Sequence, residues 1–186
     1  MRGLPLSFFH NISYPRNAVL VTSEDFEGKA NAMAAAWHSP LSVRPPLYGV
    51  AISPKRATYE FIRRSKRFGI NFLPFDMLDS LHTCGRVSFR EAGEGKLRRA
   101  KLTPIRGEFG AYVIEEAYAS LECYLVKVVE VGDHDWFIGE VKSVLLRGEL
   151  RGNILNLEGV RPTLYMGEDH YATADPSSLR RGVVIE

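Results

Sequence analysis

Several features that mark common protein classes are missing from this 186-residue chain. Its two cysteines, Cys84 and Cys123, show no CxxC spacing, so we expect neither a disulfide framework nor a structural metal site. No run approaches the ~20 apolar residues of a membrane-spanning helix, and the N-terminus lacks the apolar core of a signal peptide. We therefore expect a protein of the reducing cytoplasm that makes no use of a membrane.

A strong charge imbalance is also missing. Lys and Arg number 24 against 22 Asp and Glu, which leaves a net charge of +2. Such a chain has no whole-molecule field to attract nucleic acid, and it shows no aromatic stripe inside a basic groove. We therefore expect no nucleic-acid partner, and a nucleic-acid-binding barrel is the least favoured alternative.

The chain contains many segments with strand character and few with helix character. With 45% hydrophobic residues it can form one core, and we expect a single domain over residues 1–186. There is no GxGxxG motif and no regular β-α alternation, so a Rossmann sheet is not expected. The pattern favours a mainly β fold, a closed antiparallel Greek-key barrel with a few short helices. The expected strands are 17–23, 30–39, 47–53, 68–74, 110–117, 119–132 and 135–149. Two helices are expected: a short one that begins near residue 58, and one that spans residues 75–84.

Two stretches are hard to interpret. Residues 30–39, ANAMAAAWHS, favour a helix by intrinsic propensity, but the short space between a loop and a proline-rich turn favours a strand. Residues 86–108 concentrate charge and are expected to form a surface excursion. The basic run at 96–101 either attracts a phosphorylated nucleotide or, as we favour, is a solvated face.

An unusual charge pattern occurs at Ser53-Pro54-Lys55-Arg56, directly before the first expected helix. A helix begins with unpaired N–H groups and a partial positive charge, so two cations there are costly unless an anion lies among them. The alternative is that Lys55 and Arg56 are solvated and that Thr58 is an ordinary N-cap. The residues alone favour the alternative.

Six segments together resemble one family. YPRNAVLVTS, GKANAMAAAW, SPLSVRPPLYGVAISPKRATY, FGINFLP, GDHDWFIGEV and RPTLYMGEDHY occur in the order found in flavin reductase-like proteins of the FMN-binding split β-barrel fold. The resemblance is greatest to their flavoredoxin and archaeal ferric-reductase branch, and it covers nearly the whole chain. It implies a homodimer that binds FMN near the subunit interface.

The resemblance also assigns residues to the FMN site. In similar proteins the phosphate lies at the position of Ser53, Lys55, Arg56 and Thr58. The ring system would lie against Asn31, Ala32, Met33 and Ala34, where small side chains expose the strand backbone. Lys96 is a further cofactor-binding candidate, although the Asp and Phe that flank this lysine in relatives are missing.

Two other residues have open interpretations, and a third has a single expected role. Trp37 belongs either to the core, which we favour, or to the wall of the flavin pocket. Cys84 is either a pocket residue or a small buried hydrophobe. Asn71 is expected to satisfy backbone groups.

His134 is the catalytic candidate. It lies in an expected tight turn, Gly132 to Asp135, where Asp133 or Asp135 could orient the imidazole. In similar flavin reductases the GDH histidine is near the nicotinamide side of the flavin. The alternative is an ordinary exposed turn residue.

The resemblance implies electron transfer from NADH or NADPH through FMN to an acceptor, which is free flavin, a ferric chelate or a partner protein. The nearest alternative is a flavoredoxin-like carrier that does not oxidise NAD(P)H itself, and a more distant one is a barrel that binds a ligand without redox chemistry. We also expect the short apolar segment 162–173 to cross to the partner subunit and cover its flavin, with Tyr171 near the site.

Overall fold

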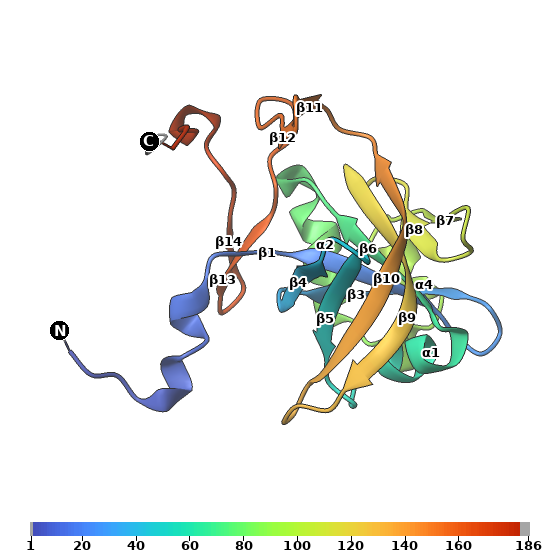
Figure 1. Ribbon diagram of the computed structural model, residues 1–186. Coiled ribbons are helices and arrows are strands. Elements are labelled where there is room, and N and C mark those ends of the chain that lie inside the picture. The colour runs from blue at the N-terminus through green and yellow to red at the C-terminus, as the bar shows by residue number, and fades with distance from the viewer. Residues whose placement is uncertain (1, 183–186) are drawn as a thin grey trace.

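The computed structural model describes residues 2–182 and is dominated by one antiparallel sheet (Figure 1). Its strand order is β3-β2-β6-β9-β10-β5-β4. The strands are β2 (Val19–Glu24), β3 (Ala30–Ala35), β4 (His38–Ser42), β5 (Leu47–Ile52), β6 (Arg67–Phe72), β9 (Ala119–Val129) and β10 (Asp135–Leu146). The predicted mainly β fold is confirmed. A single domain over 1–186 stays a prediction, and residues 1 and 183–186 lie outside the described part.

Smaller sheets and short helices surround this sheet. The small sheets contain β1 (Arg16–Asn17), β13 (Leu164–Gly167) and β14 (His170–Ala172); β7 (Pro104–Arg106) and β8 (Tyr112–Ile114); and β11 (Leu150–Arg151) and β12 (Ile154–Leu155). The helices are α1 (Ala57–Ser65), α2 (Leu78–Arg86), α3 (Phe89–Ala92) and α4 (Gly95–Arg99), with 3-10 turns at Leu6–Phe8, Asn11–Ser13, Phe75–Met77 and Pro176–Ser178. Within residues 2–182, none of the helices has the length and apolar character needed to cross a membrane.

The main sheet is curled around its core. Val21 of β2 and Val50 of β5 belong to the same buried cluster, although three strands separate β2 from β5 in the sheet. A flat sheet cannot bring such distant strands together, so the sheet must bend. The strands β3 and β4 are the two edges of this sheet, and within residues 2–182 they do not pair with each other. Closure into a barrel stays a prediction.

Gly139 shows why this core requires a glycine. A Cβ atom at this position of β10 would lie 2.5 Å from the Phe68 ring, which is itself fully buried. The register between β9 and β10 also shifts at Ile138/Gly139, a β-bulge that bends the strand. The missing side chain thus makes room for Phe68 at the bend.

A second core lies on the other face of β2 and β3, beneath α2 and α4. Leu20, Leu81, Cys84 and Leu97 are buried together there. The expected surface excursion at 86–108 is therefore only partly a surface, because α4 contributes to this core. The apolar residue Leu97 stands between cations in the sequence, so the basic run gave no sign that this segment is partly buried.

Two local predictions have clear outcomes. The expected strand at 30–39 is interrupted after Ala35 and resumes as β4, because the chain turns there from one edge of the sheet to the other. Asn71 satisfies backbone groups, as expected: its amide donates to the Leu20 carbonyl at 3.0 Å, and its oxygen accepts from the Ile114 N–H at 2.8 Å. These bonds tie β6 to β2 and β8.

Candidate functional site

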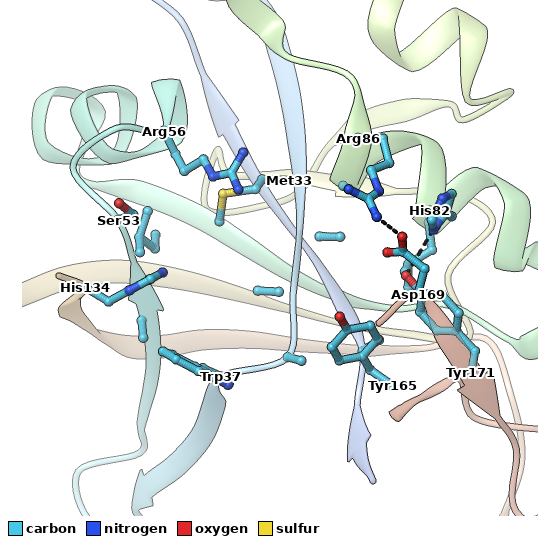
Figure 2. Close-up of a pocket in the computed structure, with 18 of the residues that line it drawn as sticks. Met33, Trp37, Ser53, Arg56, His82, Arg86, His134, Tyr165, Asp169 and Tyr171 are labelled. Carbon is cyan, nitrogen blue, oxygen red and sulfur yellow. Dashed lines mark hydrogen bonds and ion pairs between the residues drawn. The ribbon is translucent and has the colours of Figure 1, made fainter. Parts of the chain in front are cut away.

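A cavity of about 480 Å³ lies between the main sheet, α2 and the β13–β14 hairpin (Figure 2). This volume is in the range of cofactor sites. One part of its wall is formed by small residues, which are Ala18, Ala34, Ala35, Ala36, Ala51 and Gly85. Small side chains leave room for a flat ring system to approach the backbone.

One end of the cavity is cationic. Arg56 lines it together with Ser53 (Figure 2), and Arg56 is also the N-cap residue of α1. Among residues 2–182 no side chain caps this nine-residue helix. The Tyr59 N–H donates to the Arg56 carbonyl at 3.0 Å, and the N–H groups before it in the first turn can bind an anion. The predicted helix start near residue 58 is one residue late, and Thr58 is not the N-cap.

Lys96 brings a second cation close to the same end. The residue is only 4% exposed, and burial lowers the pKa of its ammonium, while the Arg56 guanidinium lowers it further. Within residues 2–182 neither Lys96 nor Arg56 forms an ion pair. Two neighbouring cations without a carboxylate are costly unless an anion joins them.

Asn31 connects β3 to the start of α1. Its amide donates to Ser23 Oγ at 3.1 Å and to Thr58 Oγ1 at 2.9 Å, and all three residues are buried. The Asn31 Oδ1 atom is buried without a partner in the described residues. An orphaned acceptor of this kind is rare in a folded protein and is consistent with a missing donor from a ligand.

The structure divides the predicted cofactor residues into two groups. Met33, Ala34, Ser53 and Arg56 line the cavity, and so does the predicted catalytic residue His134. Those that do not line it are Asn31, Ala32, Lys55, Thr58 and Lys96. Asn31, Ala32, Thr58 and Lys96 are buried, whereas Lys55 is exposed to solvent.

His134 faces the cavity from the turn between β9 and β10 (Figure 2). The Asp133 carboxylate bonds its Nδ1 atom at 2.9 Å, so the orienting aspartate is Asp133. The hydrogen bond from His134 lowers the pKa of this carboxyl. The imidazole also lies 5.1 Å from the Trp37 ring, centroid to centroid. Trp37 lines the cavity, so the interpretation of Trp37 as a core residue is wrong.

Cys84 belongs to the core. It is 1% exposed, does not line the cavity and carries a thiol whose pKa burial raises to about 11. The second of its two interpretations, a small buried hydrophobe, describes it.

Aromatic side chains line much of the cavity in a continuous row, here called the aromatic belt. Seven rings form the belt, and all seven line the cavity; in order they are His134, Trp37, His10, Tyr14, Tyr165, Tyr171 and His82. Along this order the distances between successive ring centroids are 5.1, 6.4, 6.3, 5.1, 5.3 and 5.9 Å. Sequence reasoning missed most of the belt, because its rings come from segments far apart in the chain.

The segment 162–173 reaches the cavity of its own chain. Its hairpin β13–β14 brings Tyr171 to the site, where the Tyr171 hydroxyl lies 3.3 Å from His82 Nδ1. Asp169 in the same hairpin forms an ion pair with Arg86 of α2 (Figure 2). Tyr171 lies at the site, as expected, and the segment contacts its own chain through Tyr171 and Asp169. The expected crossing of this segment to a partner subunit stays a prediction.

Together these features suit a flat ligand with an anionic tail. The small-residue wall accommodates a ring system, Arg56 and the free N–H groups of α1 accommodate the anion, and His134 approaches from the side. Within residues 2–182 no group of three or more His, Cys, Asp or Glu side chains is arranged to hold a metal ion.

Comparison with known proteins agrees with this geometry. A family model described as "Flavin reductase like domain" matches residues 11–174. An uncharacterized protein of Aeropyrum pernix is 43% identical over 168 residues, which cover 90% of this chain and only 63% of that protein. The chain therefore spans less than two thirds of that relative's length.

Two solved structures extend the comparison. An FMN-binding protein from Thermus thermophilus, solved with bound 1-cyclohex-2-enone, is 32% identical with a TM-score of 0.79, and the match covers 97% of each chain. A flavoredoxin from Methanosarcina acetivorans is 25% identical with a TM-score of 0.85, covering 100% of this chain and 96% of that one.

Proposed function

Because the chain belongs to the flavin reductase-like family, we propose that it binds FMN in the described cavity and acts as an oxidoreductase. In this proposal NADH or NADPH supplies the electrons, and free flavin, a ferric chelate or a partner protein receives them. When bound, FMN supplies the hydride and electron transfer chemistry, which no side chain can perform.

The observation that carries the proposal is the cationic end of the cavity. Arg56 and the buried Lys96 approach the start of α1, and within residues 2–182 neither cation forms an ion pair with a carboxylate. A phosphate dianion would receive charge-assisted hydrogen bonds there. Ser53 adds a hydroxyl, and the exposed Lys55 adds only long-range attraction.

The remaining residues would hold the rest of the cofactor. Met33 and Ala34 line the cavity and would contact the ring system, and the small buried residue Ala32 precedes them in the same strand. Asn31 and Thr58 hold the start of α1 against β3. His134 would position the nicotinamide ring or exchange a proton, with its orientation set by Asp133.

A flavoredoxin-like carrier is the second candidate. The likeness to the flavoredoxin of Methanosarcina acetivorans favours it, since that fold match covers the whole of this chain. Such a carrier would keep the FMN site and receive electrons from another protein rather than from NAD(P)H. A non-redox ligand-binding barrel is a weaker third candidate.

Three further points belong to the proposal. The curled sheet would close into the barrel expected for a split β-barrel. Two chains would form a homodimer. The location would be the cytoplasm, a compartment that suits the two free buried cysteines.

Anaerobic spectroscopy of the purified protein separates the candidates. The proposed reductase is yellow with bound FMN and is bleached by NADH or NADPH. A yellow protein that neither nucleotide bleaches would be the carrier, and a protein that binds no FMN would contradict both.

A further inference from the structure

The aromatic belt and the small-residue wall have different surfaces within one cavity. The wall exposes strand backbone and methyl groups, which suit the flavin ring in the proposed function. The belt presents seven ring systems, including Trp37 and Tyr165, to the same space. Aromatic surfaces favour stacked or edge-on contact with another planar ring. The belt is therefore suited to a second planar molecule beside the cofactor.

Tyr165 gives this surface a polar group that points into the cavity (Figure 2). The other two tyrosine hydroxyls of the belt are engaged: Tyr14 accepts from Trp37 Nε1 at 3.2 Å, and Tyr171 bonds His82. Within residues 2–182 the Tyr165 hydroxyl forms no hydrogen bond. A free hydroxyl at this position can donate to the carbonyl oxygen of a bound ring.

Charge at the far end of the cavity restricts the second molecule further. Glu168 and Asp169 both line this end, and within the described residues 2–182 Asp169 forms an ion pair, with Arg86, whereas Glu168 forms none. The arginine therefore does not offset both carboxylates. A multiply negative ferric chelate would be repelled there, whereas an uncharged ring compound would not.

We propose that the electron acceptor is a quinone that packs on the aromatic belt and accepts a hydrogen bond from Tyr165. This inference rests on the proposed FMN-dependent function. Reduction of a quinone to a hydroquinone takes two electrons and two protons. The reduced cofactor supplies both electrons and one proton, the Tyr165 hydroxyl supplies the other proton, and water restores it.

The first test uses flavin reduced with dithionite, so it does not depend on NADH or NADPH. The reduced protein is mixed anaerobically with menadione, or with ferricyanide, an oxidant that needs no hydrogen bond. The Tyr165→Phe variant should reoxidise with menadione roughly tenfold more slowly and with ferricyanide at the wild-type rate. Tyr124→Phe is the matched control, because Tyr124 is 45% exposed and lies outside the cavity.

The second test measures menadione binding without the cofactor. Menadione on the belt should quench the fluorescence of Trp37 in flavin-free protein, and Tyr165→Leu should weaken this binding severalfold. The proposal would be overturned if Tyr165→Leu bound menadione as tightly as wild type does. It would also be overturned if Tyr165→Phe slowed flavin reoxidation equally with menadione and with ferricyanide. A protein that binds menadione in this way and is not bleached by NAD(P)H would contradict only the reductase function.

Discussion

The Tyr59 hydroxyl donates a hydrogen bond to Asp135 Oδ2 at 2.6 Å and so joins α1 to the turn that carries His134. Asp135 is 5% exposed, and its other oxygen accepts from the Val131 N–H at 3.3 Å across the base of the turn. Arg56 is the N-cap residue of the same helix. This hydrogen bond therefore helps to fix the position of Arg56, the proposed phosphate contact, relative to His134, the proposed catalytic residue.

Removal of this link should loosen the turn. In Tyr59→Phe the ring stays, but its hydroxyl no longer donates to Asp135 or accepts from Arg63 Nη1 at 3.2 Å. The Arg63 contact is exposed and adds little, so we expect the free energy of unfolding to fall by about 1 kcal/mol. Urea unfolding at neutral pH measures it, with Tyr124→Phe as the control. No loss of stability would mean that the Tyr59–Asp135 bond adds nothing to the fold.

His134→Ala tests the reductase chemistry. The variant should bind FMN normally, because His134 contacts neither Arg56 nor the start of α1 in the proposed arrangement. Anaerobic reduction by NAD(P)H should slow by roughly tenfold to a hundredfold if one oriented contact is lost. Reoxidation by oxygen should barely change. An unchanged reduction rate would make His134 an ordinary turn residue and would favour the carrier.

The lowered pKa of Lys96 should make the free energy of unfolding depend on pH. Because the pKa of Lys96 is lowered in the folded protein, the unfolded chain binds more protons between that pKa and the ordinary value of 10.5. In flavin-free protein the contribution of Lys96 to stability therefore rises with pH through this window. Cys84 acts in the opposite direction, since its pKa is raised to about 11.

The Lys96 ammonium itself lowers the pKa of Cys84, so the lysine is isolated by comparing Cys84→Ala with the double variant Cys84→Ala/Lys96→Met. The free energy of unfolding of Cys84→Ala, minus that of the double variant, should increase as the pH rises toward 10.5. Denaturant titrations at several alkaline pH values measure this difference. A difference that does not vary with pH would show that the folded protein leaves the Lys96 pKa unshifted.

Exposed apolar side chains support the homodimer. Leu6 is 91% exposed, Val43 85% and Ile12 76% in the single chain. Large apolar residues exposed to this extent suggest a covering surface. Light scattering at micromolar concentration should give twice the 20.9 kDa mass of one chain. A monomeric mass with FMN bound would refute the dimer.

The sequence predicted the parts of the molecule whose signals are local. Period-2 alternation located the long strands β9 and β10, and the sequence Ser53-Pro54-Lys55-Arg56 located the cationic end of the cavity. It could not locate the aromatic belt, because its rings come from segments spread along the chain from His10 to Tyr171. It also concealed the burial of Lys96, because a lysine among other cations has the pattern of a solvated helix.

The central claim is that Arg56 binds the phosphate of FMN, and the most direct test compares two flavins. Arg56→Ala should weaken FMN binding by roughly tenfold to a hundredfold, as expected for loss of a charge-assisted contact of about 1.5–3 kcal/mol. Riboflavin, which lacks the phosphate, should lose little affinity. Arg63→Ala is the control, because Arg63 lies on the same helix outside the cavity wall. Wild-type FMN affinity in Arg56→Ala, or an equal loss for both flavins, would contradict the account.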